Sequence, residues 1–168
     1  LNIKNRVFFT LFIATFSNIQ KVYIKATRKM IIAITGGSGF IGKQLVNLHT
    51  KQGDEVRLLT RKSPKKNSDI NYFVGDLSNP KIDLFDFVKD VDILYHCAGE
   101  INHKTLMEEL HINGTQKLVD AAKGRIGRWV QLSSVGAYGK CHNGIITESS
   151  IEQPVGIYER TKAESDHI

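Results

Sequence analysis

The chain has 168 residues, of which 41% are hydrophobic and 24% charged, a composition typical of one folded domain with its own core. The net charge of +6 suggests a nucleic-acid-binding protein, but residues 1–29 carry six bases and no acid. The remaining 17 bases equal the 17 acids. Residues 30–168 therefore lack the excess positive charge that binding to phosphate backbones requires, and we expect no nucleic-acid partner.

Residues 1–29 differ from the rest of the chain. Residues 7–16 read VFFTLFIATF, an apolar run of ten. This run is shorter than the roughly 20 residues of a membrane span, and no clear signal-peptide cleavage site follows it. The chain begins with Leu1, whereas Met30 stands directly before the first predicted strand. We therefore expect residues 1–29 to be an upstream extension, with membrane association through residues 7–16 as the alternative.

The two cysteines, Cys97 and Cys141, form no CxxC motif and no His/Cys cluster with the spacing of metal ligands. They are typical of reduced thiols in a cytoplasmic protein. The histidines His96, His103 and His111 have no partners at metal-ligand spacing. We expect them to lie in the core or at the surface, and we expect no metal site.

From Met30 onwards, short apolar runs alternate with helical segments. The predicted strands are 31–35, 55–60, 70–74, 92–97 and 129–133, and the predicted helices are 41–52, 84–88 and 106–123. Strands that alternate with helices pair in parallel through right-handed crossovers, and continuous apolar runs are typical of buried parallel strands. The predicted fold is α/β, a doubly wound parallel sheet of the Rossmann type. Its ligand site should lie at the carboxyl ends of the strands, near the topological switch.

Residues 35–42, TGGSGFIG, form a glycine-rich loop between the first strand and the first helix. Gly37, Gly39 and Gly42 have the G-x-G-x-x-G spacing, and Gly36, Gly39 and Gly42 have the G-x-x-G-x-x-G spacing. Glycines here permit a tight turn, close approach of the backbone to a pyrophosphate, and close helix–strand packing. The loop therefore predicts a dinucleotide site at the helix N-terminus.

The end of the second strand bears on the choice of cofactor. NAD sites place an acid there to bind the ribose 2′-hydroxyl, but Asp54 and Glu55 lie at the other end of this strand. Arg61 follows the strand instead, and a guanidinium can pair bidentately with a 2′-phosphate. We therefore expect NADP as the preferred cofactor, with NAD as the alternative.

Three polar residues late in the chain suggest that the protein catalyses proton and hydride transfer. Tyr158 and Lys162 are four residues apart and so lie on one face of a helix. An ammonium near a phenol favours phenolate and lowers its pKa, which suits proton exchange with a substrate hydroxyl or carbonyl. A serine at the end of the fifth strand can hydrogen-bond the same substrate oxygen. Hydride would then move between the adjacent carbon and a nicotinamide.

The order of these motifs, from TGGSGFIG through GDL, YHCAGE, INGT and SSVGAYG to the Tyr–Lys pair, resembles the extended short-chain dehydrogenase/reductase family. These are NAD(P)-dependent epimerases and dehydratases, and the resemblance runs from Met30 to the last residue. It implies that the catalytic residues are Ser134, Tyr158 and Lys162. The predicted cofactor-binding residues, which include the Arg61 named above, are Gly36, Gly37, Gly39, Phe40, Ile41, Gly42, Arg61, Asp76, Leu77, Cys97, Ala98, Gly99, Asn113, Ser133, Tyr158 and Lys162.

The resemblance also assigns roles within this set. Asp76 and Leu77 should bracket the adenine, residues 97–99 should line the cofactor, and Asn113 should be the structural asparagine of the fourth helix. The substrate would carry a hydroxyl or keto group, as in a nucleotide-activated sugar, and members often form homodimers through helices of this domain.

Several alternatives stay open. Epimerisation and simple carbonyl reduction both fit, as does a catalytically inactive dinucleotide-binding fragment or NADP sensor. Dehydration is disfavoured, because Val135 and Gly136 stand where sugar-nucleotide 4,6-dehydratases carry an Asp–Glu pair. The family continues with further strands and a substrate-binding lobe, so we expect the chain to be an N-terminal portion that is inactive alone.

Overall fold

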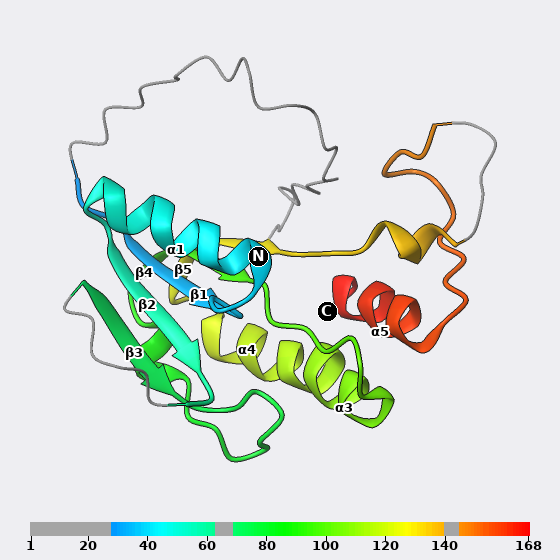
Figure 1. The fold of residues 1–168 in the computed structure, drawn as a ribbon, viewed down its shortest axis with the longest axis horizontal. Helices are drawn as coiled ribbons and strands as arrows, with labels where there is room; N and C mark the ends of the chain where they lie inside the picture. The colour runs from blue at the N-terminus through cyan, green and yellow to red at the C-terminus, as the bar shows by residue number, and fades with distance from the viewer. Residues whose placement is uncertain (1–27, 63–68, 140–144) are drawn as a thin grey trace.

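The computed structural model describes residues 28–62, 69–139 and 145–168 (Figure 1). Its centre is a five-stranded parallel sheet in the order β3-β2-β1-β4-β5. The strands are β1 (Ile31–Thr35), β2 (Glu55–Thr60), β3 (Ile70–Val74), β4 (Val91–His96) and β5 (Ile126–Gln131). The chain builds outward from β1 to β3 and then returns to place β4 beside β1. The topological switch therefore lies between β1 and β4, and the predicted doubly wound fold is confirmed.

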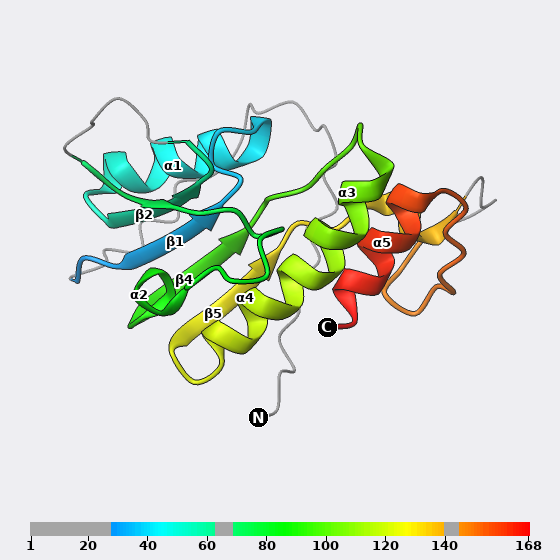
Figure 2. The same cartoon turned by 90° about the horizontal axis from the view of Figure 1, so that it is seen from below.

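Helices cover both faces of the sheet (Figure 2). They are α1 (Phe40–Gln52), α2 (Phe85–Val88), α3 (Lys104–Glu108), the π-helical turn η1 (Glu109–Gly114), α4 (Thr115–Ala122), the 3-10 turn η2 (Val135–Tyr138) and α5 (Ile157–Asp166). α1 lies on one face, whereas α2 and α4 lie on the other. No helix within the described ranges is long and apolar enough to cross a membrane, and residues 7–16 lie outside those ranges.

The core is divided between the two faces because side chains of a strand point alternately to either side. Ile32 and Ile34 of β1 pack with Val46 of α1, whereas Ala33 between them packs with the cluster around Phe87 and Leu118. All three β1 residues have 0% exposed surface. This explains why the strand is a continuous apolar run, since a strand buried on both faces has no polar side.

The predicted strands match the structure except at β5, and the predicted helix 106–123 is divided into α3, η1 and α4. The first three strands have the predicted bounds, and β4 starts and ends one residue earlier than predicted. β5 begins at Ile126 and ends at Gln131, so Ser133 and Ser134 lie in the loop after the strand. The early start of β5 was not predicted, because Gly127 is typical of a turn. In the structure a Cβ on Gly127 would lie 2.8 Å from the carbonyl oxygen of Asp92 on the neighbouring strand. Close strand pairing thus explains a glycine that is typical of a turn.

Candidate active site

The glycine loop packs directly against the turn that follows β4. Gly36 has φ +68°, and a Cβ there would lie 2.6 Å from the backbone nitrogen of Ala98. A Cβ on Gly42 would lie 2.3 Å from the carbonyl oxygen of Gly36. The Gly39 amide donates to that same oxygen at 3.0 Å. Backbone therefore fills the space that side chains would need, and the loop is held at the switch point.

The first turn of α1 fits the pyrophosphate of a dinucleotide. The helix has Gly39 as its N-cap, without a side-chain cap, and no acid in the first turn. Its initial N–H groups and the positive end of its dipole thus suit an anion. Phe40 is exposed and Ile41 half-buried at this end of the helix. This helix end, held in place by the close backbone packing of Gly36 and Gly42, suits the dinucleotide that the sequence predicts.

Polar residues beneath this loop join the two switch-point strands. Thr35 Oγ1 accepts from the Ala98 amide at 3.2 Å and lies 2.7 Å from His96 Nδ1. His96 Nε2 lies 3.0 Å from Thr115 Oγ1 on α4. Burial, together with the positive charge of Lys162, lowers the pKa of His96 to about 3. His96 is therefore a neutral core residue that fixes the ends of β1 and β4, as the sequence suggested.

Helix α5 positions the predicted catalytic pair. Lys162 is 5% exposed, and none of the described residues forms a hydrogen bond or ion pair with its ammonium. Burial lowers the pKa of Lys162, while the nearby Asp166 opposes that shift. The same ammonium acts electrostatically on Cys97 and on His96. Lys162 therefore projects toward the turn after β4, where the glycine loop also lies.

The expected lowering of the Tyr158 pKa is not found, and Lys162 is not among the charges that shift it. The pKa of Tyr158 is raised, first by burial and then by the carboxylates of Glu159 and Asp166. The phenol is half-buried, and the charges that act on it are negative. The tyrosine is thus a neutral phenol at neutral pH, suited to donating a proton rather than accepting one.

The two serines after β5 have different partners. Ser133 donates a short hydrogen bond to Asp166 of α5, and the Gln131 amide donates to the same carboxylate at 2.8 Å. Ser134 Oγ accepts from the Gly136 amide at 3.2 Å and caps η2. Ser133, predicted to contact cofactor, therefore ties β5 to α5. Ser134 keeps its hydroxyl proton available for another acceptor.

The remaining predicted cofactor residues lie at the carboxyl ends of other strands. Arg61 is exposed immediately after β2. Asp76 Oδ1 accepts from both the amide and the hydroxyl of Ser78, at 2.9 and 2.8 Å, which fixes the orientation of its carboxylate. Leu77 is buried in the core. Cys97 is a partly buried free thiol whose pKa burial raises to about 11, and Cys141 lies outside the described residues.

Asn113 is not brought to this site. It is exposed on the outer side of η1, and its amide donates to Glu109 at 3.2 Å. His111, two residues earlier, occupies the inward position and is 1% exposed. The sequence predicts only a core or surface place for His111, because nothing in the apolar pattern signals a π-helical turn that changes which residues face inward.

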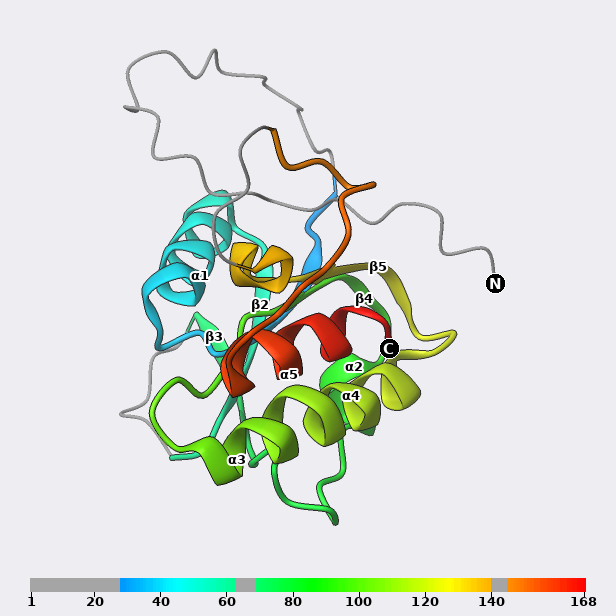
Figure 3. The same ribbon diagram turned by 90° about the vertical axis from the view of Figure 1, so that its right-hand side faces the viewer.

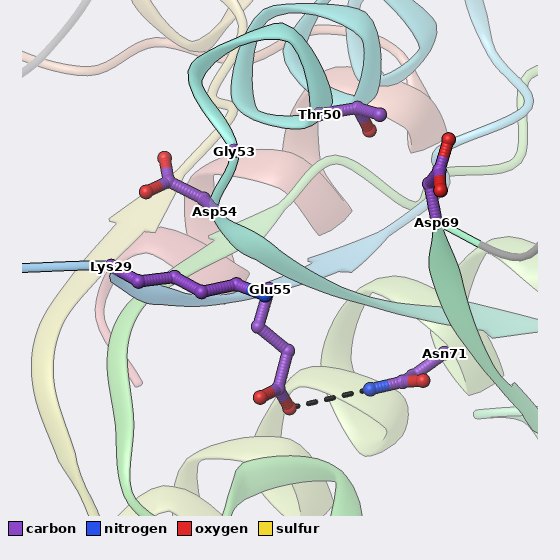
Figure 4. Close-up of a pocket in the computed structure, with 7 residues that line it drawn as sticks. All are labelled: Lys29, Thr50, Gly53, Asp54, Glu55, Asp69 and Asn71. Atoms are coloured by element: carbon purple, nitrogen blue, oxygen red, sulfur yellow. Dashed lines mark hydrogen bonds between the residues drawn. The ribbon is translucent and has the colours of Figure 1, made fainter.

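A cavity of about 310 Å³ lies at the opposite, amino end of the sheet (Figure 4). It is lined by Lys29, Thr50, Gly53, Asp54, Glu55, Asp69 and Asn71. Asp54 and Glu55 lead into β2, so the cavity is remote from the carboxyl ends of the strands and contains none of the predicted site residues. No group of three or more His, Cys, Asp or Glu among the described residues could hold a metal ion.

Comparison with known protein families shows that residues 32–168 match the NAD dependent epimerase/dehydratase family. The chain belongs to this family. The glycine loop and α5 both fall within the matched residues.

Three similar proteins illustrate the range of the family. The low-salt glycan biosynthesis protein Agl12 of Haloferax volcanii is 29% identical over 82% of this chain and 50% of its own. A ceramide reductase of Caulobacter vibrioides is 29% identical over 64% of this chain and 35% of its own. The dTDP-glucose 4,6-dehydratase DesIV of Streptomyces venezuelae, solved with NAD bound, is 28% identical with a TM-score of 0.70, over 82% of this chain and 50% of that one. The chain thus spans about half the length or less of these relatives.

Proposed function

We propose that this chain provides the cofactor-binding and catalytic portion of an NAD(P)-dependent enzyme that acts on a hydroxyl or keto carbon of a nucleotide-activated sugar. The observation that supports the proposal most strongly is that Lys162 and the glycine loop both lie close to Cys97. The ammonium of Lys162 acts on Cys97, and the glycine loop packs against the carbonyl of that same residue through Gly36. The predicted catalytic helix and the predicted dinucleotide loop therefore meet at one turn beside the topological switch.

The cofactor would be held by the N-terminus of α1 and by the strand ends. Residues 36–42 suit the pyrophosphate, Asp76 suits the adenine end, and the turn at residues 97–99 suits the rest of the dinucleotide. Arg61 favours the 2′-phosphate of NADP over the hydroxyl of NAD, because its exposed guanidinium can pair with a phosphate. When bound, the nicotinamide accepts a hydride from the substrate carbon or returns one.

The side chains of α5 and of the loop after β5 handle the proton. Tyr158, whose pKa is raised, donates its phenolic proton to a substrate carbonyl oxygen and becomes a phenolate. In the reverse direction the Tyr158 phenolate receives the proton from the substrate hydroxyl and becomes a neutral phenol. The Lys162 ammonium stabilises the phenolate that forms when Tyr158 gives up its proton. Ser134 donates a hydrogen bond to the same substrate oxygen.

A sugar substrate is supported by the relatives whose names concern glycan biosynthesis and dTDP-glucose. Dehydration is not proposed, because no acid or base stands at Val135 or Gly136 to drive a β-elimination. Carbonyl reduction is the second candidate, supported by the ceramide reductase among the similar proteins. The two differ in that a reductase consumes cofactor and an epimerase regenerates it.

Turnover with and without the phenol tests the proposal. The protein is incubated with NAD(P)⁺ and a panel of nucleotide sugars, beginning with dTDP-glucose and UDP-glucose, and with NAD(P)H and carbonyl compounds. Product analysis detects epimerisation, and nicotinamide absorbance detects reduction. Tyr158→Phe should abolish turnover while leaving cofactor binding unchanged, and turnover at the wild-type rate would refute the proton-transfer role. Binding of cofactor without any conversion would instead fit the inactive dinucleotide-binding fragment or sensor that the sequence leaves open.

A further inference from the structure

His111 lies where the catalytic helix meets the rest of the domain. It belongs to η1, the π-helical turn between α3 and α4, and α5 packs beside α3 and η1 (Figure 3). Its imidazole is 1% exposed. The ring stands edge-on to the Tyr158 ring, with centroids 5.5 Å apart and an interplanar angle of 82°. This is the favoured T-shaped geometry for such a pair.

Both ring nitrogens of His111 are used. Nε2 accepts from the backbone amide of Glu100 at 2.9 Å, and Nδ1 lies 2.8 Å from Thr161 Oγ1. A backbone amide can only donate, so Nε2 carries no proton and the proton of the neutral ring is on Nδ1. His111 therefore donates to Thr161, whose hydroxyl donates in turn to the Tyr158 carbonyl at 3.1 Å. The result is a directed chain of hydrogen bonds from Glu100 to Tyr158.

The Glu100 end of this chain is itself fixed. Its carboxylate Oε1 accepts from the amides of Asn102 and His103, at 2.7 and 3.1 Å. Glu100 directly follows Gly99, the last residue of the turn predicted to line the cofactor. The bond to His111 thus joins that turn to the first turn of α5.

We infer that His111, as the neutral Nδ1–H tautomer, is the positioning residue of Tyr158, holding the catalytic helix in register with the turn after β4. This inference rests on the proposed function of Tyr158. His111 has three attachments, to the Glu100 amide, the Thr161 hydroxyl and the Tyr158 ring, and together they constrain the backbone and the ring of the tyrosine. A displacement of about 1 Å at such a site can lower a reaction rate about 100-fold, so the register matters.

The tautomer is tested directly on the wild-type protein. Nitrogen-15 spectra of histidine side chains distinguish the two neutral tautomers and the imidazolium. His111 should give the Nδ1–H pattern at pH 7, and its signals are assigned as those lost in His111→Phe. An Nε2–H pattern, or an imidazolium, would overturn the inference, because neither can accept from Glu100.

Substitutions then test positioning. His111→Phe keeps a ring beside Tyr158 but removes both hydrogen bonds, and Thr161→Val removes the hydroxyl link. The matched control is His49→Phe, because His49 of α1 is also buried and its ring lies 5.5 Å from the ring of Tyr95, which packs on the α1 face of the sheet. His111→Gln, whose amide has an acceptor and a donor, serves as the conservative rescue.

The readouts separate positioning from stability and from the proposed function. The pKa of Tyr158 is measured by ultraviolet difference titration against Tyr158→Phe. In His111→Phe and Thr161→Val this pKa should fall toward the ordinary value, because a loosened helix admits water to the phenol. His49→Phe should leave that titration unchanged. Turnover should fall about 100-fold in His111→Phe, with KM little changed and partial recovery in His111→Gln. An identical Tyr158 titration in wild type and His111→Phe would overturn the inference. The expected tautomer and titration without any turnover would support the positioning of Tyr158 and count only against turnover by this chain.

Discussion

Gly36 lies against the backbone of Ala98, so that a Cβ on the glycine would be 2.6 Å from the alanine nitrogen. This contact joins the cofactor loop on β1 to the turn after β4, and it explains why the first glycine of the motif tolerates no side chain. Gly36 also has φ +68°, in the left-handed region that disfavours other residues.

Gly36→Ala should therefore lower the free energy of unfolding by far more than the backbone strain alone would. Gly124 is the matched control, because it has φ +74° but no atom within 4 Å of the point where a Cβ would lie. We expect Gly124→Ala to lower the free energy of unfolding by about 1–2 kcal/mol, the strain alone. Gly36→Ala should lose more than this and should abolish cofactor binding. Urea unfolding and fluorescence titration with NAD(P)H measure the two effects, and equal losses of stability would contradict the close contact.

We expect the charge of Lys162 to lower the free energy of unfolding and to be necessary for turnover. The residue is 5% exposed, its ammonium has no hydrogen-bond partner among the described residues, and burial lowers its pKa. Lys162→Met keeps the apolar stem and removes the charge, so the free energy of unfolding should rise by about 1–2 kcal/mol while turnover is lost. Urea unfolding at pH 7 measures the gain. A variant that is less stable than wild type would show that the ammonium has a stabilising partner.

Stability should decrease when the buried histidines are protonated. The folded-state pKa is about 3 for His96 and about 4 for His111, because of burial and the Lys162 charge, with Glu100 opposing the shift at His111. Groups with a depressed folded pKa stabilise the fold above their unfolded value near 6.5, and that stability is lost as pH falls toward the folded values. For His111 the loss between pH 6.5 and 4 is about 3 kcal/mol.

The interval between pH 6.5 and pH 5 isolates this effect, since ordinary carboxylates stay largely ionised there. Wild type should lose stability across the interval in urea unfolding, and His111→Gln should lose less, because the substituted residue cannot be protonated. Equal pH dependence in the two proteins would show that His111 is not a neutral buried group.

Arg61 should determine the choice between the two nicotinamide cofactors. Arg61→Glu removes the partner of a 2′-phosphate and supplies an acceptor for a ribose hydroxyl. We expect NADPH binding to weaken by about 10- to 100-fold, the value of a charged hydrogen bond, and NADH binding to strengthen. Lys62→Glu is the control on the neighbouring residue. If Arg61→Glu leaves the ratio of the two dissociation constants unchanged, the arginine does not contact the cofactor.

Features that depend on local chemistry were predictable from the sequence. Strands such as Ile31–Thr35 are apolar because they are buried on both faces, and the glycines at 36 and 42 reflect close backbone contacts. The first residues of the strand that starts at Ile126 were not predicted because Gly127 resembles a turn, although pairing with β4 requires it.

Features that depend on tertiary contacts were not predictable. The π-helical turn faces His111 inward and Asn113 outward, and no apolar periodicity signals that shift. The raised pKa of Tyr158 arises from burial and from carboxylates, one of which, Asp166, lies two turns further along α5. Spacing in the sequence brought Lys162 to the same helical face, but it could not give the relative strength of these effects.

Binding of the nicotinamide cofactors tests the central claim most directly. The protein is titrated with NADPH and with NADH, and binding is followed by fluorescence in parallel with Gly36→Ala. Saturable binding to the wild-type protein, lost in Gly36→Ala and tighter for NADPH, is the predicted result. Tighter binding of NADH would contradict the role of Arg61 but retain the dinucleotide site. Absence of saturable binding to a folded wild-type protein would contradict the claim that the glycine loop is a dinucleotide site.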